Sequence, residues 1–344
     1  MPSLSEIHTV LPNHGVPQSQ LGEIGEIWLK DDPDALEKFV RISGNSGVKQ
    51  RYFSLPYQEI LSLNGLGRRA ELFGLHGGRL LSQVVDAALS ETQAEQIGHF
   101  IFTSCSVPLI PSIDAAVVLE SRLPRTVARI PIYQHGCAGG VVALALASKL
   151  AALGKPVLVS AVELCSLVFQ PQDHAGAQLV GAAIFGDGAA ALVVEPQGGQ
   201  IEIVDAESYL ISDSRHLMGY DIFDDGFYLR LDRSLPQALV QEAPRRVADF
   251  LSKNGLAIGD IDYWLFHPGG VRILEFLEEA LDLQRDQCRW SREVLSEVGN
   301  LSSASVLFVL KRFMEAGQLS YGERALMLGI GPGLTIETVL MEKR

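Results

Sequence analysis

Short apolar runs alternate with longer helical runs along most of this 344-residue chain. The short runs are apolar at nearly every position, so we expect strands whose sheet is covered on both faces. They lie at residues 99–105, 128–135, 156–163, 190–196, 263–268, 324–330 and 334–342. The helical runs lie at residues 75–92, 138–153, 235–254, 270–283 and 302–317. This alternation predicts an α/β fold with helices layered on the sheet.

The alternation contains a weak two-fold echo, because each half has a strand, a helix, a strand and a reactive residue at a strand end. The segment PQGGQ at residues 196–200 interrupts two strand-like runs. We therefore predict an N-terminal half over residues 1–200 and a C-terminal half over residues 201–344. Hydrophobic residues make up 47% of the chain, which is enough to bury a large core.

The charge of the chain excludes one class of partner. Acidic residues outnumber basic ones by 41 to 28, for a net charge of −13. A protein that binds nucleic acid would carry a basic excess, so we expect no such partner. The same negative field repels anionic ligands, so a site for a phosphorylated substrate has to be locally basic.

The sequence shows no membrane, export or metal signal. The first residues, MPSLSEIHTVLPNHGVP, lack the basic and apolar regions of a signal peptide. The longest apolar stretch, at residues 138–153, is shorter than the roughly 20 residues of a spanning helix. The four cysteines form no CxxC pair. We expect a cytoplasmic protein with no membrane contact, no disulfide framework and no metal site.

Cys137 is the first candidate for chemistry. In the segment IPIYQHGCAGGVVALALA a strand ends at a glycine, the cysteine follows, and a strongly helical run begins. A thiol at a helix N-terminus lies near unpaired N–H groups, which stabilise a thiolate. A buried structural cysteine is the alternative, and the local sequence alone favours it.

His267 and Asn300 are the second and third candidates. His267 ends an apolar strand in YWLFHPGG, the kind of position that delivers a side chain into a cleft. Asn300, in VGNLSSASVLFVLKRF, either caps the following helix or directs its amide into the same cleft. A core histidine and a structural cap remain the alternatives. Together with Cys137 they form a set known from thiol catalysis, although the local signature of papain-like proteases is missing.

Five motifs in the sequence resemble those of a known protein family. The segments YQHGCAGG, FGDGAAALVV, HPGG, GNLSSASV and GIGPGLTIETV occur in the order of the type III polyketide synthases. The chain resembles this chalcone and stilbene synthase family of the thiolase superfamily, as a compact bacterial-type member. The resemblance implies two similar αβαβα halves in one layered structure, a homodimer, and acyl-CoA and malonyl-CoA as substrates with no cofactor.

The resemblance also implies roles for the candidates. Cys137 would be the nucleophile that carries the acyl chain, and an ion pair with His267 would keep it reactive. His267 and Asn300 would form the oxyanion hole that stabilises the enolate from malonyl-CoA. Lys38 and Arg41 match two residues that hold the CoA phosphates, which would supply the local positive charge that the composition requires.

A further group of residues matches the family's gatekeeper and cavity positions. Phe185 matches a gatekeeper phenylalanine, whereas Leu229 and Ile330 stand where aromatic residues are common. Pro108 stands where plant members place a methionine across the dimer interface. The cavity would be lined by Phe185, Leu229, Thr103, Cys165, Val168, Tyr220, Ile330 and Ser302.

Three functional hypotheses remain open. The first is a synthase that extends an aliphatic acyl-CoA starter with malonyl-CoA and releases a pyrone or resorcinol. The second is a stand-alone ketosynthase that joins two CoA-bound or carrier-bound chains, with an acyl carrier protein as a further candidate partner. The third is a non-catalytic acyl-binding scaffold, which the presence of Cys137, His267 and Asn300 disfavours.

Overall fold

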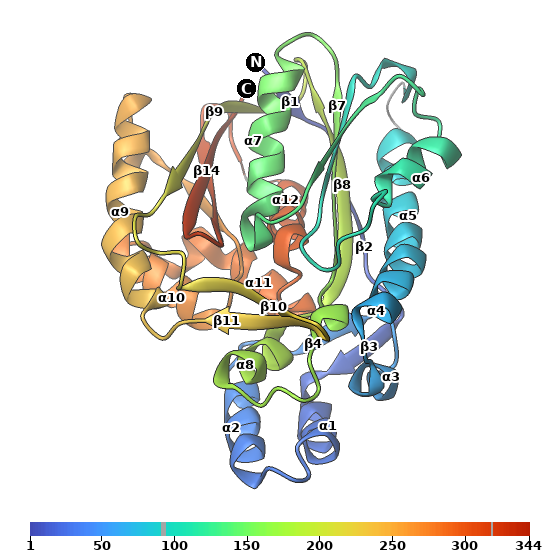
Figure 1. The fold of residues 1–344 in the computed structure, drawn as a ribbon. Helices are drawn as coiled ribbons and strands as arrows, with labels where there is room; N and C mark the ends of the chain where they lie inside the picture. The colour runs from blue at the N-terminus through green and yellow to red at the C-terminus, as the bar shows by residue number, and fades with distance from the viewer. Residues whose placement is uncertain (91–93, 318) are drawn as a thin grey trace.

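A mixed β-sheet of ten strands runs through the centre of the molecule (Figure 1). The computed structural model describes residues 1–90, 94–317 and 319–344. In spatial order the strands are β12 (Tyr263–Phe266), β13 (Arg324–Gly331), β14 (Thr335–Lys343), β9 (Ile201–Leu210), β1 (Ser3–Leu4), β8 (Asp187–Glu195), β7 (Val157–Leu164), β5 (His99–Thr103) and β6 (Ala128–Ile132), with β2 (His8–Val10) paired to β8. Buried residues occupy both faces of β7 and almost all of β8 and β13, as the uniformly apolar runs predicted.

The two ends of the sheet are built on the same plan. Strand β5 is parallel to β7, and β7 is antiparallel to β8. Strand β12 is likewise parallel to β13, and β13 is antiparallel to β14. The short β1 joins the two sets, because Ser3 pairs with Glu195 of β8 and with Glu202 of β9. This repeated arrangement is the α/β layered fold that the sequence predicted.

Twelve α-helices are described around the sheet and beneath it (Figure 1). They are α1 (Leu21–Trp28), α2 (Pro33–Gly44), α3 (Tyr57–Ser62), α4 (Leu66–Leu72), α5 (Gly78–Ser90), α6 (Asp114–Glu120), α7 (Gly139–Ala151), α8 (Gly176–Ile184), α9 (Leu235–Lys253), α10 (Val271–Ala280), α11 (Arg289–Val298) and α12 (Ser305–Ala316). None of the helices in the described ranges combines the length and the apolarity needed to cross a membrane.

Helix α7 is the central helix of the fold. It contacts strands of both ends of the sheet, including β5 and β7 on one side and β13 and β14 on the other. Its sequence, GGVVALALASKLA, is apolar around most of its circumference, as a helix buried on several sides requires. Helix α12 packs beside it, and both helices begin close to candidate site residues.

The structure reproduces the predicted long elements with small shifts at their ends. The run 75–92 is helix α5 preceded by one π-helical turn over Phe73–Gly77, and residues 91 and 92 lie outside the described residues. The sequence did not predict α1, α2, α3, α4, α6, α8 or α11. It also did not predict the two-stranded sheets β3 (His14–Pro17)–β4 (Gln50–Phe53) and β10 (Met218–Phe223)–β11 (Gly226–Leu231).

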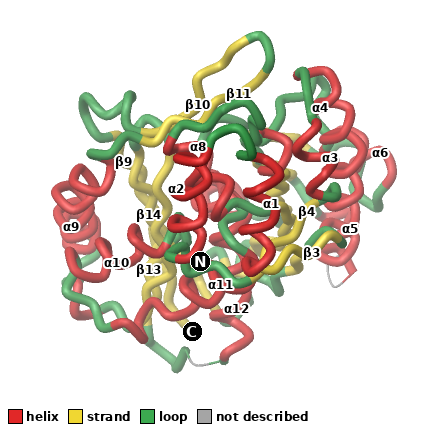
Figure 2. Tube along the Cα trace, turned by 90° about the horizontal axis from the view of Figure 1, so that it is seen from below, coloured by secondary structure: helices red, strands yellow, loops and turns green. Residues whose placement is uncertain are grey.

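The N-terminal helices form a layer beneath the sheet. Viewed from below, α1 and α2 lie near the centre with α8 beside them (Figure 2). Asp32 caps α2 by accepting a hydrogen bond from the Ala35 N–H at 3.0 Å, and Pro33 occupies the first helical position. These helices and the β10–β11 hairpin bound the region in which the candidate site lies.

Candidate active site

Cys137 lies at the start of the central helix, as the sequence predicted. It belongs to a 3-10 turn, η4 (Gly136–Ala138), which leads directly into α7. Gly136 has φ 51°, and a Cβ there would lie 2.7 Å from Pro332 Cδ, so the turn before the thiol requires glycine. The thiol is half-buried at the N-terminal end of α7.

His267 follows strand β12, and its backbone N–H donates to Leu328 O at 2.8 Å. The side chain is only 5% exposed. Neither ring nitrogen has a hydrogen-bond partner among the described residues. Buried polar atoms in folded proteins are nearly always paired, so an imidazole with two unpaired nitrogens is typical of a ligand-binding site.

Asn300 is held by its backbone and by its side-chain oxygen. Its N–H donates to Ile184 O at 2.8 Å, and its carbonyl accepts from the Gly186 N–H at 3.0 Å. The Oδ1 atom accepts from the Ser302 N–H at 2.8 Å and from the Ser305 hydroxyl at 3.3 Å. These bonds orient the amide so that Nδ2 is the free donor end, and its one weak bond goes to Gly269 O at 3.4 Å.

Ser302 connects two thiols. Its hydroxyl lies 3.7 Å from Cys137 Sγ and 3.1 Å from Cys105 Sγ. The residue has φ 48°, an uncommon backbone conformation for a side chain other than glycine. The sequence placed Ser302 in the cavity, but it assigned no role to Cys105, which reaches Ser302 across 197 residues of chain.

Burial dominates the electrostatics of the two candidate groups. It raises the pKa of the Cys137 thiol to about 11, and hydrogen bonds to Ser302 and Asn300 offset part of the rise. Burial also lowers the pKa of the His267 imidazole to about 3. Both shifts favour the neutral form. Burial thus disfavours the charged form of each group taken singly, and the ion pair between Cys137 and His267 stays a prediction.

Glu163 is a buried carboxylate whose hydrogen bonds hold residues next to this site. The carboxylate is fully buried and accepts hydrogen bonds from the hydroxyls of Ser106 and Ser303, both at 2.5 Å, and from the Cys105 N–H at 3.1 Å. Burial raises the pKa of Glu163, while these hydrogen bonds oppose the rise. The network ties the Cys105 loop to the turn η8 (Ser302–Ala304), and the sequence gave no signal for it.

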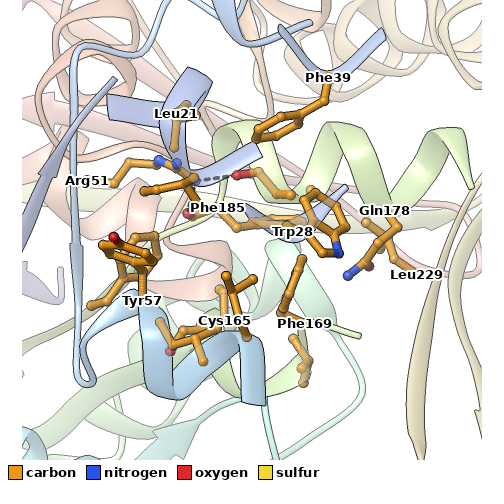
Figure 3. Close-up of a pocket in the computed structure, with 18 of the residues that line it drawn as sticks. Leu21, Trp28, Phe39, Arg51, Tyr57, Cys165, Phe169, Gln178, Phe185 and Leu229 are labelled. Atoms are coloured by element: carbon orange, nitrogen blue, oxygen red, sulfur yellow. Dashed lines mark hydrogen bonds between the residues drawn. The ribbon is translucent and has the colours of Figure 1, made fainter. Parts of the chain in front are cut away.

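An apolar pocket of about 80 Å³ is lined by Cys165 and by residues of α1, α2, α8 and the β10–β11 hairpin (Figure 3). Five of the predicted cavity residues line it: Phe185, Leu229, Cys165, Val168 and Tyr220. Tyr220 and Leu229 are direct partners in the β10–β11 hairpin, so both present their side chains on the same face. Burial raises the pKa of the Tyr220 phenol.

The other predicted cavity residues do not line this pocket. Ser302 contacts the thiols instead. Thr103 packs against the start of α7, where a Cβ on Gly139 would lie 2.5 Å from Thr103 Oγ1. Ile330 is buried in the core, where it pairs with Ile336 of β14. It does not line this pocket, so its predicted cavity role has no support from the pocket lining.

Lys38 and Arg41 are exposed on the outer face of α2, one turn apart. Neither forms an ion pair with any described residue, so both charges are free to meet a ligand. Between them Phe39 points inward and lines the pocket. Asn45, at the C-cap of α2, donates its amide to Arg41 O at 2.8 Å.

The described residues contain no cluster of three or more His, Cys, Asp or Glu side chains that could hold a metal ion. The reactive side chains that the site presents are a thiol, an imidazole and an amide. A thiol can carry an acyl group, and a free imidazole and amide can donate hydrogen bonds to a developing oxyanion.

Comparison with known proteins agrees with this geometry. The chain matches the model of the chalcone and stilbene synthase N-terminal domain over residues 3–197 and that of the C-terminal domain over residues 202–343. It is 31% identical to 1,3,6,8-tetrahydroxynaphthalene synthase of Streptomyces coelicolor, over 99% of this chain and 92% of the relative. It is 32% identical to phloroglucinol synthase of Pseudomonas fluorescens, over 99% of both chains.

Solved structures show the same similarity. The crystal structure of 1,3,6,8-tetrahydroxynaphthalene synthase from Streptomyces coelicolor, a bacterial type III polyketide synthase, matches with a TM-score of 0.95 over 99% of both chains, at 31% identity. The type III polyketide synthase domain of Steely1 from Dictyostelium matches with a TM-score of 0.93 over 99% of both chains, at 25% identity.

We predict that Ser302→Ala slows alkylation of Cys137 by iodoacetamide about threefold to tenfold at a given pH below the thiol pKa. A hydroxyl that donates to the thiolate stabilises the charged form and lowers the pKa, so its removal raises the pKa and reduces the thiolate fraction. Labelling rates measured by mass spectrometry of the Cys137 peptide over a pH series should shift to higher pH.

Ser303→Ala is the matched control for this prediction, because its hydroxyl bonds to Glu163 and not to a thiol. Thermal unfolding of both variants should be measured, and the comparison holds if both remain folded at the labelling temperature. An unchanged pH profile in Ser302→Ala would show that the hydroxyl does not act on the nucleophile.

Proposed function

The chain belongs to the chalcone and stilbene synthase family of type III polyketide synthases, which condense CoA-linked starters with malonyl-CoA, and from this we propose that it extends an aliphatic starter on Cys137. The product released would be a small pyrone or resorcinol. One observation carries the proposal. The Cys137 thiol at the start of α7 has Ser302 and Asn300 as hydrogen-bond partners, and the buried His267 imidazole has no partner among the described residues.

Loading of the starter uses the neutral state of the two groups. A free nitrogen of His267 accepts the Cys137 thiol proton as the sulfur attacks the thioester carbonyl of the acyl-CoA. The carbonyl oxygen becomes an oxyanion, and the Asn300 Nδ2 amide and the protonated imidazole donate to it. When the carbonyl reforms, the C–S bond to CoA breaks, and the imidazolium returns its proton to the CoA sulfur.

Extension uses the same two donors for a different charge. Malonyl-CoA loses carbon dioxide, and the electron pair of the broken C–C bond moves onto the thioester oxygen as an enolate. His267 and Asn300 hold this oxygen in a site that excludes water, where hydrogen bonds are electrostatically stronger. The enolate carbon then attacks the acyl carbonyl on Cys137 and releases the Cys137 sulfur, so the chain grows by two carbons.

The chemistry of the pocket supports an aliphatic starter. Cys165, Val168 and Leu229 line the pocket with apolar atoms, and a hydroxylated aromatic starter would bury hydroxyls without partners there. Tyr220 occupies space in the pocket, which favours one or two extensions. Two extensions suffice for a pyrone, whereas a resorcinol would need a third; the relatives named above carry the names of polyhydroxylated aromatic products, which supports the resorcinol alternative.

We also propose a homodimer formed through the β6 edge of the sheet. Strand β6 is the last strand of the sheet on its side, and most of its residues are exposed. Ile110 beside it is 101% exposed, and Leu119 on α6 is 62% exposed. An unpaired strand edge next to exposed large apolar side chains favours pairing with the same edge of a second copy of the chain. Pro108, which stands at the family's interface position, is also exposed.

The first test is the reaction itself. We expect the protein to form a covalent acyl adduct from hexanoyl- or decanoyl-CoA and to release short polyketides when malonyl-CoA is added. Cys137→Ala should form neither adduct nor product while its thermal unfolding remains close to that of the parent. Intact-protein mass spectrometry and product masses provide the measurement.

Three outcomes would contradict parts of this proposal. An adduct of equal size on Cys137→Ala would remove the nucleophile assignment. A preference for coumaroyl-CoA would refute the aliphatic starter. Product from malonyl-CoA alone, at the same rate with and without an added starter, would show that the starter itself derives from malonyl-CoA.

The second test separates the two donors. Asn300→Ala should reduce decarboxylation of malonyl-CoA by about a hundredfold, close to the ~3 kcal/mol typical of one lost oxyanion donor, while slow acyl loading of Cys137 persists. Asn254→Ala, which removes a side-chain amide at the C-cap of α9, is the control. Normal decarboxylation with lost loading in Asn300→Ala would reverse the assigned roles.

The third test concerns the CoA phosphates. Lys38→Glu combined with Arg41→Glu should raise KM for acyl-CoA more than it lowers kcat, because these residues contact a remote part of the substrate in ground and transition states alike. The KM of the parent should rise with ionic strength. Lys155→Glu, at an exposed position away from α2, is the control. An unchanged KM in the double variant would place the CoA site elsewhere.

A further inference from the structure

Three segments that line the apolar pocket lie far apart in the sequence. Tyr57 lines it from helix α3, Cys165 from the 3-10 turn η5 (Cys165–Val168), and Leu229 from the β10–β11 hairpin (Figure 3). The two strands of the hairpin pair with each other and, in the described part of the chain, with no strand of the ten-stranded sheet. Contacts outside the central sheet therefore have to fix the hairpin against the other two segments.

Arg69, in helix α4, binds two of these segments from outside the pocket. Its side chain is 1% exposed and does not line the pocket. The Nη1 atom donates to Leu167 O of η5 at 2.6 Å, and Nη2 donates to Leu63 O, at the C-cap of α3, at 3.2 Å. The same Nη2 donates to Gln170 Oε1 at 3.3 Å. One guanidinium thus connects the end of α3, the turn η5 and the side chain of Gln170.

Gln170 extends this connection to the hairpin. Its side chain is buried, and its Nε2 donates to Phe227 O of β11 at 3.2 Å. A Cβ on Gly226 would lie 1.9 Å from Gln170 Nε2, so the amide packs directly against hairpin backbone that only glycine allows it to approach. Phe227 precedes Leu229 by two positions on the same strand, so the two side chains share one face. A displacement of Phe227 therefore moves the pocket lining at Leu229.

The buried charge of Arg69 is costly for stability. No carboxylate of the described residues forms an ion pair with it, and its Nε atom has no partner there. A charge removed from water without a counter-ion is unfavourable, and an apolar side chain would fill the same space without this cost. A guanidinium differs from an apolar group in having five donors in one plane, which can bind several acceptors at set positions. An arginine here therefore indicates a positioning role.

We propose that Arg69 and Gln170 are positioning residues that hold α3, η5 and the β10–β11 hairpin at a fixed separation, and that this separation decides which acyl chains the pocket accepts. The inference rests on the proposed function, because it takes acyl-CoA as the ligand. Gln170 is the link between the two sides: its oxygen accepts from Arg69 and its nitrogen donates to the hairpin.

Gln170→Glu separates the two ends of this connection. The carboxylate still accepts from Arg69, so the buried guanidinium keeps its partner, but it cannot donate to Phe227 O. We expect thermal unfolding close to that of the parent, while the hairpin amides at residues 218–231 exchange with deuterium about threefold to tenfold faster, the range that one lost hydrogen bond implies. Amides of β13 in the core should exchange at the parent rate.

The second measurement is binding without turnover. Acetyl-, hexanoyl- and decanoyl-CoA are titrated by calorimetry in a Cys137→Ala background. Gln170→Glu should shift the ratio of affinities toward decanoyl-CoA by about threefold to tenfold, because a hairpin freed from this hydrogen bond makes room for the longer chain. The affinity for acetyl-CoA should change little, since its two-carbon acyl group gains little from a wider pocket.

Arg69→Lys provides a second variant that keeps the buried charge. Its single side-chain nitrogen cannot bind Leu63 O, Leu167 O and Gln170 together in the geometry of the guanidinium, so exchange and affinity ratio should change in the same direction. The matched controls are Gln172→Glu and Arg68→Lys. Gln172 is exposed and lines no part of the pocket, and Arg68 is exposed and pairs with Glu71. Both controls should match the parent in both measurements.

Three results would overturn the inference. Unchanged exchange of the hairpin amides in Gln170→Glu would show that Gln170 does not hold the hairpin. Faster exchange with an unchanged affinity ratio would show that the held separation does not select the chain. An equal loss of affinity for all three CoA esters, acetyl-CoA included, would show that the pair serves only the stability of the fold.

The outcomes also separate this inference from the proposed function. If exchange and affinity ratio change as expected but the parent condenses no starter with malonyl-CoA, the positioning role stands and the proposed function falls. If the parent condenses acyl-CoA starters but the variants keep its exchange rates and its affinity ratio, the proposed function stands and the positioning role falls. If the parent binds none of the three CoA esters, both fall.

Discussion

The close approach of two helix starts is the constraint on which the site depends. A Cβ on Gly140, in the first turn of α7, would lie 2.3 Å from Ser303 O, at the turn that leads into α12. A Cβ on Gly139 would lie 3.0 Å from Ser303 Cβ. Only glycine permits this contact, and the contact brings the turn with Cys137 against the turn with Asn300 and Ser302. The two small residues after the nucleophile therefore serve the packing of the two halves, in addition to leaving room for a substrate.

Burial also affects the charge states of the Cys137 and His267 side chains. Burial raises the pKa of Cys137 and lowers that of His267, so the surroundings of each group disfavour its charged form. In the proposed reaction, charge develops when a proton moves during loading and when carbon dioxide leaves malonyl-CoA. A site of low dielectric stabilises such transient charge strongly if oriented donors already face it. The bonds that fix Asn300 Oδ1 provide that orientation before any substrate arrives.

Local patterns predicted the parts of the site that depend on local structure. Cys137 at a helix start and His267 at a strand end could be inferred because glycine, apolar runs and helix formers signal these elements within a few residues. Cys105 and Glu163 could not, because their roles depend on Ser302 and Ser303, which lie far along the chain. The hairpin that pairs Tyr220 with Leu229 was missed because its strands mix polar and apolar residues. Ile330 resembled a cavity position in its motif, whereas strand pairing directs it into the core.

Helix α2 connects the two ends of the proposed substrate. Lys38 and Arg41 face solvent on one side of it, while Phe39 faces the pocket on the other. A helix that turns about 100° per residue separates neighbouring positions in this way, so a single short element can meet the CoA phosphates outside and the alkyl tail inside. None of these positions lies in the machinery around Cys137. The side chains of Cys137, His267 and Asn300 lie instead at the turn before α7, at the end of β12 and before the turn that leads into α12.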